Sequence, residues 1–257
     1  MKQELNVVKI GGNVIDDPDM LKAVLQEFKK LEGFKVLVHG GGKIASDLSK
    51  KLGIKPNMID GRRVTDEETL KVVTMAYAGL INKNIVAQLQ ALRCNVLGLT
   101  GADANLIPAH KREHEEIDYG YVGDFYVNDI NSRQLSLFLE EGITPVFCAI
   151  THDQQGNLLN TNADTLASGI AMSLTEKYQV NLIYCFEKPG VLLDSEDDST
   201  LIRDLNYLHY QQLKDDGFIH DGMIPKLDNA FSAADHGVAV IIKHALDLNK
   251  PAGTLLS

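Results

Sequence analysis

Short apolar runs alternate along this 257-residue chain with longer segments whose apolar residues recur at helical spacing. The runs carry Val, Ile and Leu at consecutive positions, so a strand formed by them is apolar on both faces. Strands of this kind, separated by helices, are typical of a mostly parallel sheet between two layers of helices. We therefore expect an α/β protein with a three-layer αβα sandwich. Its strands are predicted at Leu5–Ile10, Lys35–His39, Asn95–Leu99, Thr144–Ile150, Asn181–Phe186 and Val238–Lys243.

The segments between these runs predict the helices. They are Asp19–Leu31, Ile44–Leu52, Asp66–Leu92, Asn131–Glu141, Ala163–Leu174, Leu205–Asp215 and Ile224–His236. Thr65 and Glu68, three residues apart, form a capping box that is predicted to begin the longest helix. Apolar residues cover most of the circumference of that helix, so we expect it to be buried between the two subunits of a homodimer.

Two segments interrupt the alternation of strands and helices. Residues 120–128, GYVGDFYVN, combine aromatic and β-branched residues, which favours a small antiparallel β-hairpin that could act as a lid. Residues 194–200, DSEDDST, are interpreted as a solvated acidic turn. No repeat or low-complexity linker divides the chain, so we expect one compact unit with two lobes around a cleft.

The composition excludes several classes of protein. A net charge of −10 argues against a nucleic-acid binder, which would carry a basic stripe. The three cysteines lie far apart in apolar contexts, which indicates reduced thiols in the cytosol. No apolar stretch approaches the roughly 20 residues of a membrane span, and the N-terminus does not read as a signal peptide. We therefore expect a cytoplasmic protein without a membrane partner.

Glycine clusters follow several predicted strands, at the sheet edge where parallel sheets bind ligands. The clusters are Gly11-Gly12, residues 40–42 and Gly190. Lys9 lies inside an otherwise apolar strand, where its charge is costly unless a partner meets it. Glycine turns and helix N-terminal amides can hold phosphate groups. Neither a Walker A loop nor the dinucleotide fingerprint is present, which disfavours a P-loop kinase and an NAD-binding enzyme.

Further polar segments offer candidate ligand contacts. Residues 160–164, NTNAD, are either a set of helix caps or a functional segment. Lys226 stands near a predicted helix N-terminus, where a cation opposes the macrodipole, so it is a candidate for holding an anion. Arg63 presents a planar fork suited to a carboxylate, although the neighbouring Arg62 could take that role instead. No His or Cys spacing indicates a metal site built by the protein.

Together these motifs closely resemble the amino acid kinase family, in particular its members that act on N-acylated glutamate. The resemblance runs in order across the whole chain. The motifs are KIGG at 9–12, HGGG at 39–42, GRRVT at 61–65, NTNAD at 160–164, PGVL at 189–192 and DGMIPK at 221–226.

The resemblance implies an αβα fold with residues 1–175 as a lobe for the acylglutamate and for dimerisation, and residues 176–257 as a lobe for ATP. The implied reaction transfers the γ-phosphoryl group of ATP, with Mg²⁺ held mainly by the nucleotide, to the side-chain carboxylate of an N-acyl-L-glutamate. The product is an acyl phosphate for arginine biosynthesis.

The resemblance also implies roles for individual residues. Lys9 and Lys226 match two lysines that stabilise the transferring phosphoryl group, and Asp164 matches the aspartate that positions them. Substrate contacts are implied for Gly41, Gly42, Arg63 and Asn160. Phosphate or nucleotide contacts are implied for Gly11, Gly12, Glu187, Gly190, Val191, Leu192, Phe218, Ile219 and His220.

The chain departs from the family pattern at residues 185–189, CFEKP, where many relatives carry a Thr/Ser-Asp-Val type segment; Glu187 could replace the aspartate. The chain starts almost directly at its first strand, whereas arginine-inhibited hexameric relatives carry an extra N-terminal helix. We therefore expect a dimer that arginine does not inhibit.

The sequence leaves the acyl group open, since a succinyl group could use Arg62. A related carboxylate, carbamate or nucleotide kinase is a second possibility, and a non-catalytic nucleotide-binding protein is a third. The presence of Lys9, Asp164 and Lys226 together argues against the third.

Overall fold

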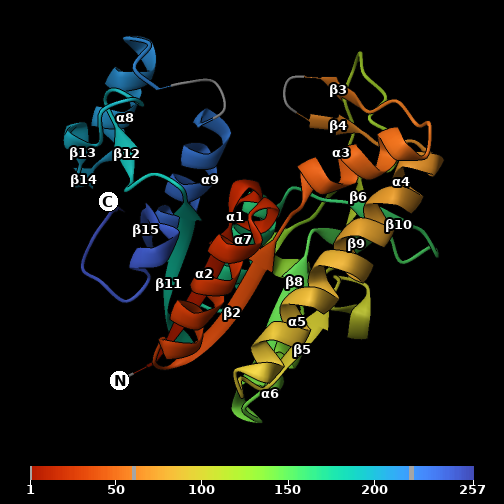
Figure 1. Cartoon of the computed structure of the whole chain (residues 1–257), viewed down its shortest axis with the longest axis horizontal. Coiled ribbons are helices and arrows are strands. Elements are labelled where there is room, and N and C mark those ends of the chain that lie inside the picture. Colours follow the sequence, from red (N-terminus) through yellow and green to blue (C-terminus); the bar gives the residue numbers. More distant parts are fainter. Residues whose placement is uncertain (1, 60–61, 220–222) are drawn as a thin grey trace.

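The computed structural model describes residues 2–59, 62–219 and 223–257, apart from the side chain of Arg62. An eight-stranded sheet in the order β14-β16-β15-β11-β1-β2-β8-β5 forms its centre (Figure 1). All neighbouring strands are parallel except β15 and β16. The strands are β1 (Gln3–Ile10), β2 (Phe34–His39), β5 (Val96–Leu99), β8 (Thr144–Cys148), β11 (Tyr178–Phe186), β14 (Asp204–Leu205), β15 (Ala239–His244) and β16 (Thr254–Leu256).

All six predicted strands lie in this sheet, which confirms the predicted fold class. The predicted strand Thr144–Ile150 is too long, because the chain leaves the sheet after Cys148. Ile150 instead begins β9 (Ile150–His152), which pairs antiparallel with β10 (Leu158–Asn160). The apolar run continues past the sheet because Ala149 and Ile150 are themselves buried. The short strands β14 and β16 were not predicted, since two or three residues show no period.

Helices cover both faces of the sheet, as expected (Figure 1). One layer contains α1 (Gly12–Asp16), α2 (Pro18–Lys30), α3 (Gly42–Lys51), α4 (Glu67–Thr74) and α5 (Asn82–Ala91), and the other contains α6 (Ser132–Glu140), α7 (Ala163–Ser173), α8 (Tyr207–Asp215) and α9 (Ile224–Asp235). Consecutive residues of β1 point to opposite faces of the sheet. Val7 packs in the hydrophobic core that includes α7, and Val8 packs in the core that includes α2. The short helix α1 was not predicted.

The longest predicted helix is continuous but not uniform. A π-helical segment, η1 (Met75–Ile81), joins α4 to α5. The predicted capping box is wrong, because Asp66 rather than Thr65 caps α4, accepting a hydrogen bond from the Thr69 amide at 2.7 Å. The Thr65 hydroxyl is directed elsewhere: it donates to the Arg63 carbonyl and accepts from the Asn160 amide.

The predicted hairpin within residues 120–128 is also wrong in its pairing. Strand β7 (Gly123–Asp124) pairs antiparallel with β6 (His110–Lys111), and residues 127–129 form the 3₁₀ turn η3 (Val127–Asp129). The partner strand lies upstream and is polar, so alternation of apolar residues could not reveal it. Other small pairs are β3 (Asn57–Ile59) with β4 (Arg62–Val64) and β12 (Val191–Leu192) with β13 (Leu201–Ile202); further 3₁₀ turns are η2 (Asp103–Asn105), η4 (Asp198–Thr200) and η5 (Ala245–Asp247).

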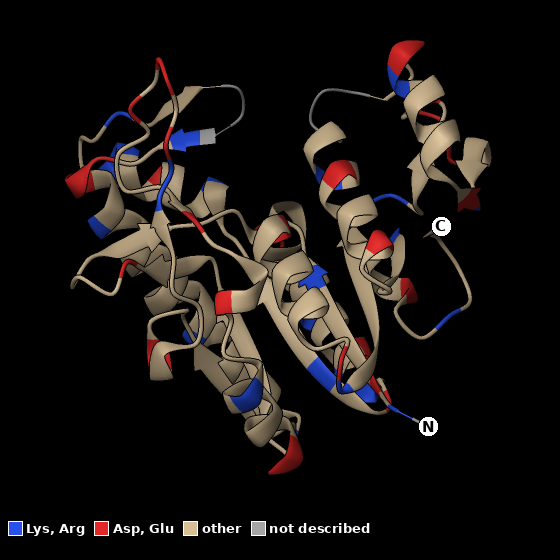
Figure 2. Ribbon diagram, turned by 180° about the vertical axis from the view of Figure 1, so that it is seen from behind, with Lys and Arg blue, Asp and Glu red and all other residues tan. Residues whose placement is uncertain are grey.

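The charged residues and the cysteines lie where the composition leads one to expect them. Figure 2 shows acidic and basic residues interspersed over both halves of the molecule in that view. The cysteines Cys94, Cys148 and Cys185 are buried and free. Within the described ranges, no helix is long and apolar enough to cross a membrane.

Candidate active site

Two glycine turns meet at the carboxyl ends of β1 and β2. Gly11 follows β1 and donates its amide to the Cys185 carbonyl of the neighbouring β11 at 3.1 Å. Gly41 is the N-cap residue of α3 and has a φ of 148°, and a Cβ there would lie 2.1 Å from Cδ1 of Ile81. The positive φ favours glycine there, and a larger residue would also have to displace the end of the Ile81 side chain. The turns place Gly12 and residues 40–42 on the wall of a cavity of about 520 Å³.

Lys9 meets a carboxylate at the floor of this cavity. Its position in β1 places it on the same face as Val7, toward α7, and its ammonium lies 2.6 Å from Oδ1 of Asp164. Both side chains are nearly buried, at 8% and 11% exposed. Each charge thus compensates the other, since an unpaired charge would be very costly at this depth. The buried lysine that stands out in the sequence is therefore explained by a residue 155 positions away (164 − 9).

The NTNAD segment serves both interpretations that the sequence left open. The side chain of Asn162 caps α7, accepting from the amides of Asp164 at 2.8 Å and Thr165 at 3.0 Å. This cap starts the helix so that Asp164 stands in its first turn, facing Lys9. Asn160 ends β10, and its side-chain amide donates to the Thr65 hydroxyl at 3.0 Å. Capping and ligand-facing positions are thus divided among neighbouring residues.

Lys226, in the first turn of α9, lines the same cavity. Burial lowers its pKa from the usual value, as does the nearby Lys9, while the charges of Asp164 and Glu187 act to raise it. The negative charge of Asp164 therefore acts on both Lys9 and Lys226. The cavity gathers two ammonium groups and one carboxylate here, which leaves a net positive charge suited to an anion.

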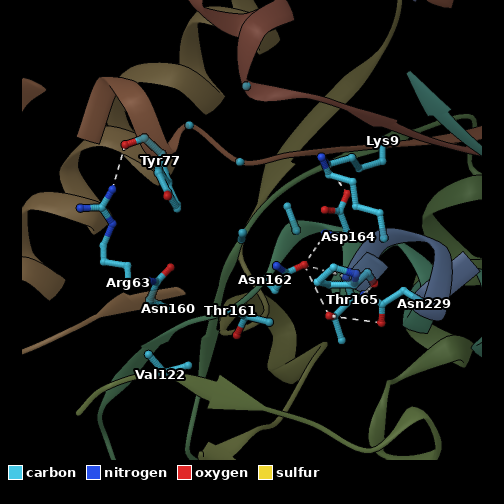
Figure 3. A pocket seen from close by; sticks show the side chains of 18 of the residues that line it. Lys9, Arg63, Tyr77, Val122, Asn160, Thr161, Asn162, Asp164, Thr165 and Asn229 are labelled. Atoms are coloured by element: carbon cyan, nitrogen blue, oxygen red, sulfur yellow. Dashed lines mark hydrogen bonds and ion pairs between the residues drawn. The ribbon is translucent and has the colours of Figure 1, made fainter. Parts of the chain in front are cut away.

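Arg63 lies at the other end of the cavity, away from Lys9 and Asp164 (Figure 3). One guanidinium nitrogen donates to the Gly42 carbonyl at 2.9 Å and to the Ser46 hydroxyl at 2.7 Å. The second terminal nitrogen is buried and has no hydrogen-bond partner. A buried charged donor without a partner is unfavourable, so this nitrogen is ready for an anionic ligand group such as a carboxylate.

The cavity has walls that the sequence did not reveal. Tyr77 is buried beside Arg63 and Gly41; burial raises the pKa of its phenol, while the Arg63 charge and the polar contact between the two side chains lower it. Arg112 forms a two-pronged ion pair with Asp124, with an Nε–Oδ2 distance of 2.8 Å. Tyr77 lies inside the longest predicted helix, where the sequence marks it only as one of many apolar residues, and no motif surrounds Arg112. Other lining residues without a sequence signal are Met58, Ala149 and Asn229.

A second, smaller cavity of about 140 Å³ adjoins the first, and Lys226 lines both. Its walls include most of the residues that the resemblance assigns to the nucleotide: Glu187, Gly190, Val191, Leu192, Phe218 and Ile219. Phe186, Lys188, Ser195 and Met223 also line it. Gly11 lines neither cavity, and His220 and the side chain of Arg62 lie outside the described part of the chain.

The two cavities thus meet at Lys226. The larger cavity offers a cationic group at each end, Arg63 and the Lys9–Lys226 pair, and the smaller cavity is more apolar. In the residues that the structure describes, no three His, Cys, Asp or Glu side chains gather to hold a metal ion. The fold and the site define a phosphate-handling α/β protein with its ligands at the carboxyl edge of a parallel sheet.

Comparison with known proteins agrees with this class. The model of the amino acid kinase family matches residues 4–244, and the chain belongs to this family. The acetylglutamate kinase of Cytophaga hutchinsonii is 52% identical over 99% of this chain and 98% of its own length, and that of Parabacteroides distasonis is 49% identical over 98% of each.

Solved structures share the fold. The crystal structure of smu.665 from Streptococcus mutans UA159 superposes with a TM-score of 0.81 at 28% identity, over 98% of each chain. The carbamate kinase from Giardia lamblia bound to AMP-PNP has a TM-score of 0.68 at 13% identity, covering 99% of this chain and 98% of that chain, and shows the fold alone.

Proposed function

We propose that this chain is an acetylglutamate kinase. It transfers the γ-phosphoryl group of ATP to the side-chain carboxylate of N-acetyl-L-glutamate, in the second step of arginine biosynthesis. The observation that carries the proposal is a cavity with a buried, unpaired arginine donor at one end and two lysines around one aspartate at the other. This arrangement suits a small dicarboxylate, one carboxylate being held and the other phosphorylated. The names of relatives about half identical over nearly the whole chain support the same activity.

The residues of the site can supply what phosphoryl transfer requires from the protein. The attacking carboxylate is already ionised at neutral pH, so no general base is needed. Phosphoryl transfer requires in-line positioning and neutralisation of charge on the transferring oxygens. Lys9 and Lys226 supply positive charge, and Asp164 fixes the position of Lys9. The amides of Gly12, Gly41 and Gly42 border the same space and can donate to phosphoryl and substrate oxygens.

Arg63 and Asn160 hold the substrate in this proposal. The free terminal nitrogen of Arg63 binds the α-carboxylate. The other terminal nitrogen keeps its hydrogen bond to the Gly42 carbonyl, which holds the glycine turn in place beside the substrate. Asn160 contacts the amide of the acyl group. A substrate that is held at Arg63 therefore presents its side-chain carboxylate toward Lys9 and Lys226.

The smaller cavity holds the nucleotide, with its phosphates directed past Lys226 into the larger one. Mg²⁺ neutralises phosphate charge and is held mainly by the nucleotide. We assign residues 1–175 to the acylglutamate and residues 176–257 to ATP. The protein is proposed to be a cytoplasmic homodimer that pairs through the helix from α4 to α5, where Met75 and Leu80 are 51% and 53% exposed.

The acyl group is the main alternative within this activity. Arg112 lines the larger cavity and could attract the additional carboxylate of an N-succinyl group. Asp124 already occupies its guanidinium through two contacts, so a succinyl carboxylate would have to compete with Asp124. This favours the neutral acetyl group.

The proposal is tested by trapping the acyl phosphate with hydroxylamine. Purified protein is incubated with Mg-ATP and, separately, with N-acetyl-, N-succinyl- and free L-glutamate. We expect hydroxamate from N-acetyl-L-glutamate, less from the succinyl compound and very little from free glutamate. No product from either N-acylglutamate would overturn the proposed function, and a preference for the succinyl compound would reassign the acyl group.

A further inference from the structure

An aromatic ring lies against both lysines of the site. Phe186 ends β11, and its ring centroid is 5.0 Å from the Lys226 ammonium and 5.7 Å from the Lys9 ammonium. A Cβ on Gly11 would lie 3.6 Å from the ring, so the ring also rests near the turn after β1. The ring of Tyr184 is stacked beside it, with centroids 6.5 Å apart and an angle of 14° between the planes.

The Tyr184 hydroxyl links this stack to the aspartate of the site. It donates to the backbone carbonyl of Asp164 at 3.1 Å, and Tyr184 is 1% exposed. The Phe186 ring therefore lies beside a buried residue that is hydrogen-bonded to α7.

The two lysines differ in how they are held. Asp164 pairs with Lys9 at 2.6 Å, whereas no described carboxylate lies within ion-pair distance of the Lys226 ammonium. The charged groups that act on Lys226 are Asp164 from α7, Lys9 from β1 and Glu187 after β11. Glu187 itself accepts a hydrogen bond from the Asn13 side chain at 2.7 Å. The Phe186 ring is thus a direct contact of an ammonium that forms no ion pair with any described residue.

We propose that Phe186 is a positioning residue that holds Lys226, and more weakly Lys9, for phosphoryl transfer without neutralising either charge. The face of an aromatic ring attracts a cation through its quadrupole. A second carboxylate at this place would also hold Lys226, but it would cancel the positive charge that the phosphoryl group must meet. A neutral ring orients the cation and leaves the site positive.

This inference rests on the proposed function, and its test separates the two. Wild-type protein is first assayed for acyl phosphate, so an inactive wild type counts against the function alone. Phe186→Leu keeps an apolar side chain of similar bulk but removes the ring, and Phe186→Tyr keeps the ring. We expect Phe186→Leu to lower kcat about five- to thirtyfold, the range that a partly desolvated cation–π contact supports. Phe186→Tyr should retain kcat within about twofold.

A double-mutant cycle tests whether the ring acts through Lys226. In a Lys226→Met background, Phe186→Leu should change kcat by less than about twofold, because the contact is already lost. Equal effects of Phe186→Leu in both backgrounds would assign the ring to packing alone. If Phe186→Leu does not fold, as judged by circular dichroism, Phe186→Met takes its place in both measurements.

A measurement on the ligand-free protein provides a readout apart from activity. The lysine side chains are labelled with ¹³C and titrated by NMR, with Lys226→Met used to assign the signal of Lys226. Because Leu buries the ammonium without attracting it, Phe186→Leu should lower the pKa of Lys226 relative to wild type, and Phe186→Tyr should not. An unchanged Lys226 pKa together with an unchanged kcat in Phe186→Leu would overturn the inference.

Discussion

Replacing Asp164 by Asn removes one charge from the buried pair while keeping the shape of the side chain. Lys9 is 8% exposed and its ammonium lies 2.6 Å from the Asp164 carboxylate, so the variant leaves a buried cation without its anion. Breaking a buried ion pair from one side costs about 3–5 kcal/mol. We therefore expect the free energy of unfolding of the ligand-free protein to fall by about that amount. Since the chain has no tryptophan, urea denaturation is followed by far-UV circular dichroism.

A matched double variant controls for packing. Lys9→Met combined with Asp164→Leu removes both charges and leaves apolar groups in their place. Exchanging both members of a buried pair for apolar side chains is often neutral or stabilising, so the double variant should recover most of the stability lost in Asp164→Asn. An Asp164→Asn protein within about 1 kcal/mol of wild type would refute the claim that this pair is a buried, mutually dependent unit.

Nucleotide binding gives a second readout of the same pair. An anion bound beside Lys9 replaces the missing carboxylate charge, so Mg-ATP should raise the thermal midpoint of Asp164→Asn more than that of wild type. Equal shifts would contradict the placement of phosphate oxygens next to Lys9.

Three further predictions concern other parts of the site. Arg63→Lys should raise KM for N-acetyl-L-glutamate about 10- to 100-fold with little change in KM for ATP, because a hydrogen bond to a charged group contributes about 1.5–3 kcal/mol; equal effects on both KM values in steady-state kinetics would argue against this role. Gly41→Ala should lower the free energy of unfolding by about 1–3 kcal/mol, since the added Cβ would meet Ile81 and the φ of 148° suits glycine. Gly12→Ala is the control and should not lower it, because the space around a Cβ at Gly12 is open. Urea denaturation compares the two variants. Burial lowers the pKa of His39 from 6.5 to about 4, so between these pH values the unfolded chain binds a proton that the folded chain does not. The free energy of unfolding should therefore fall by about 3 kcal/mol from pH 6.5 to pH 4. Urea denaturation of His39→Gln checks this, and the same pH dependence in that variant would contradict it.

The central strands and most helices could be predicted because buried parallel strands are apolar on both faces and the helices between them show a clear period. Errors occurred where a residue's role is set by a distant partner. Thr65 resembles a helix cap, but its hydroxyl bonds to Arg63 and Asn160, and Asp66 caps α4 instead. The pairing of β6 with β7 was missed because His110 and Lys111 lack any strand pattern.

Some residues of the candidate site could be recognised from the sequence, and others could not. The unusual place of Lys9 in an apolar strand and of Lys226 near a helix N-terminus drew attention to both residues, and the family resemblance added Asp164. The structure brings these residues to one cavity. Tyr77 and Arg112 enter the same cavity only through tertiary packing and the Arg112–Asp124 pair, so no local pattern marks them.

The most direct test of the central claim, that Lys9 and Lys226 act on the phosphoryl group in flight, is the steady-state kinetics of Lys226→Met. An interaction that strengthens in the transition state lowers kcat far more than it raises KM. We predict that kcat falls by at least about a hundredfold while KM for N-acetyl-L-glutamate and for ATP changes by only a few-fold. A variant with near-normal kcat and a greatly raised KM for ATP would contradict the claim, because Lys226 would then bind only the ground state of the nucleotide.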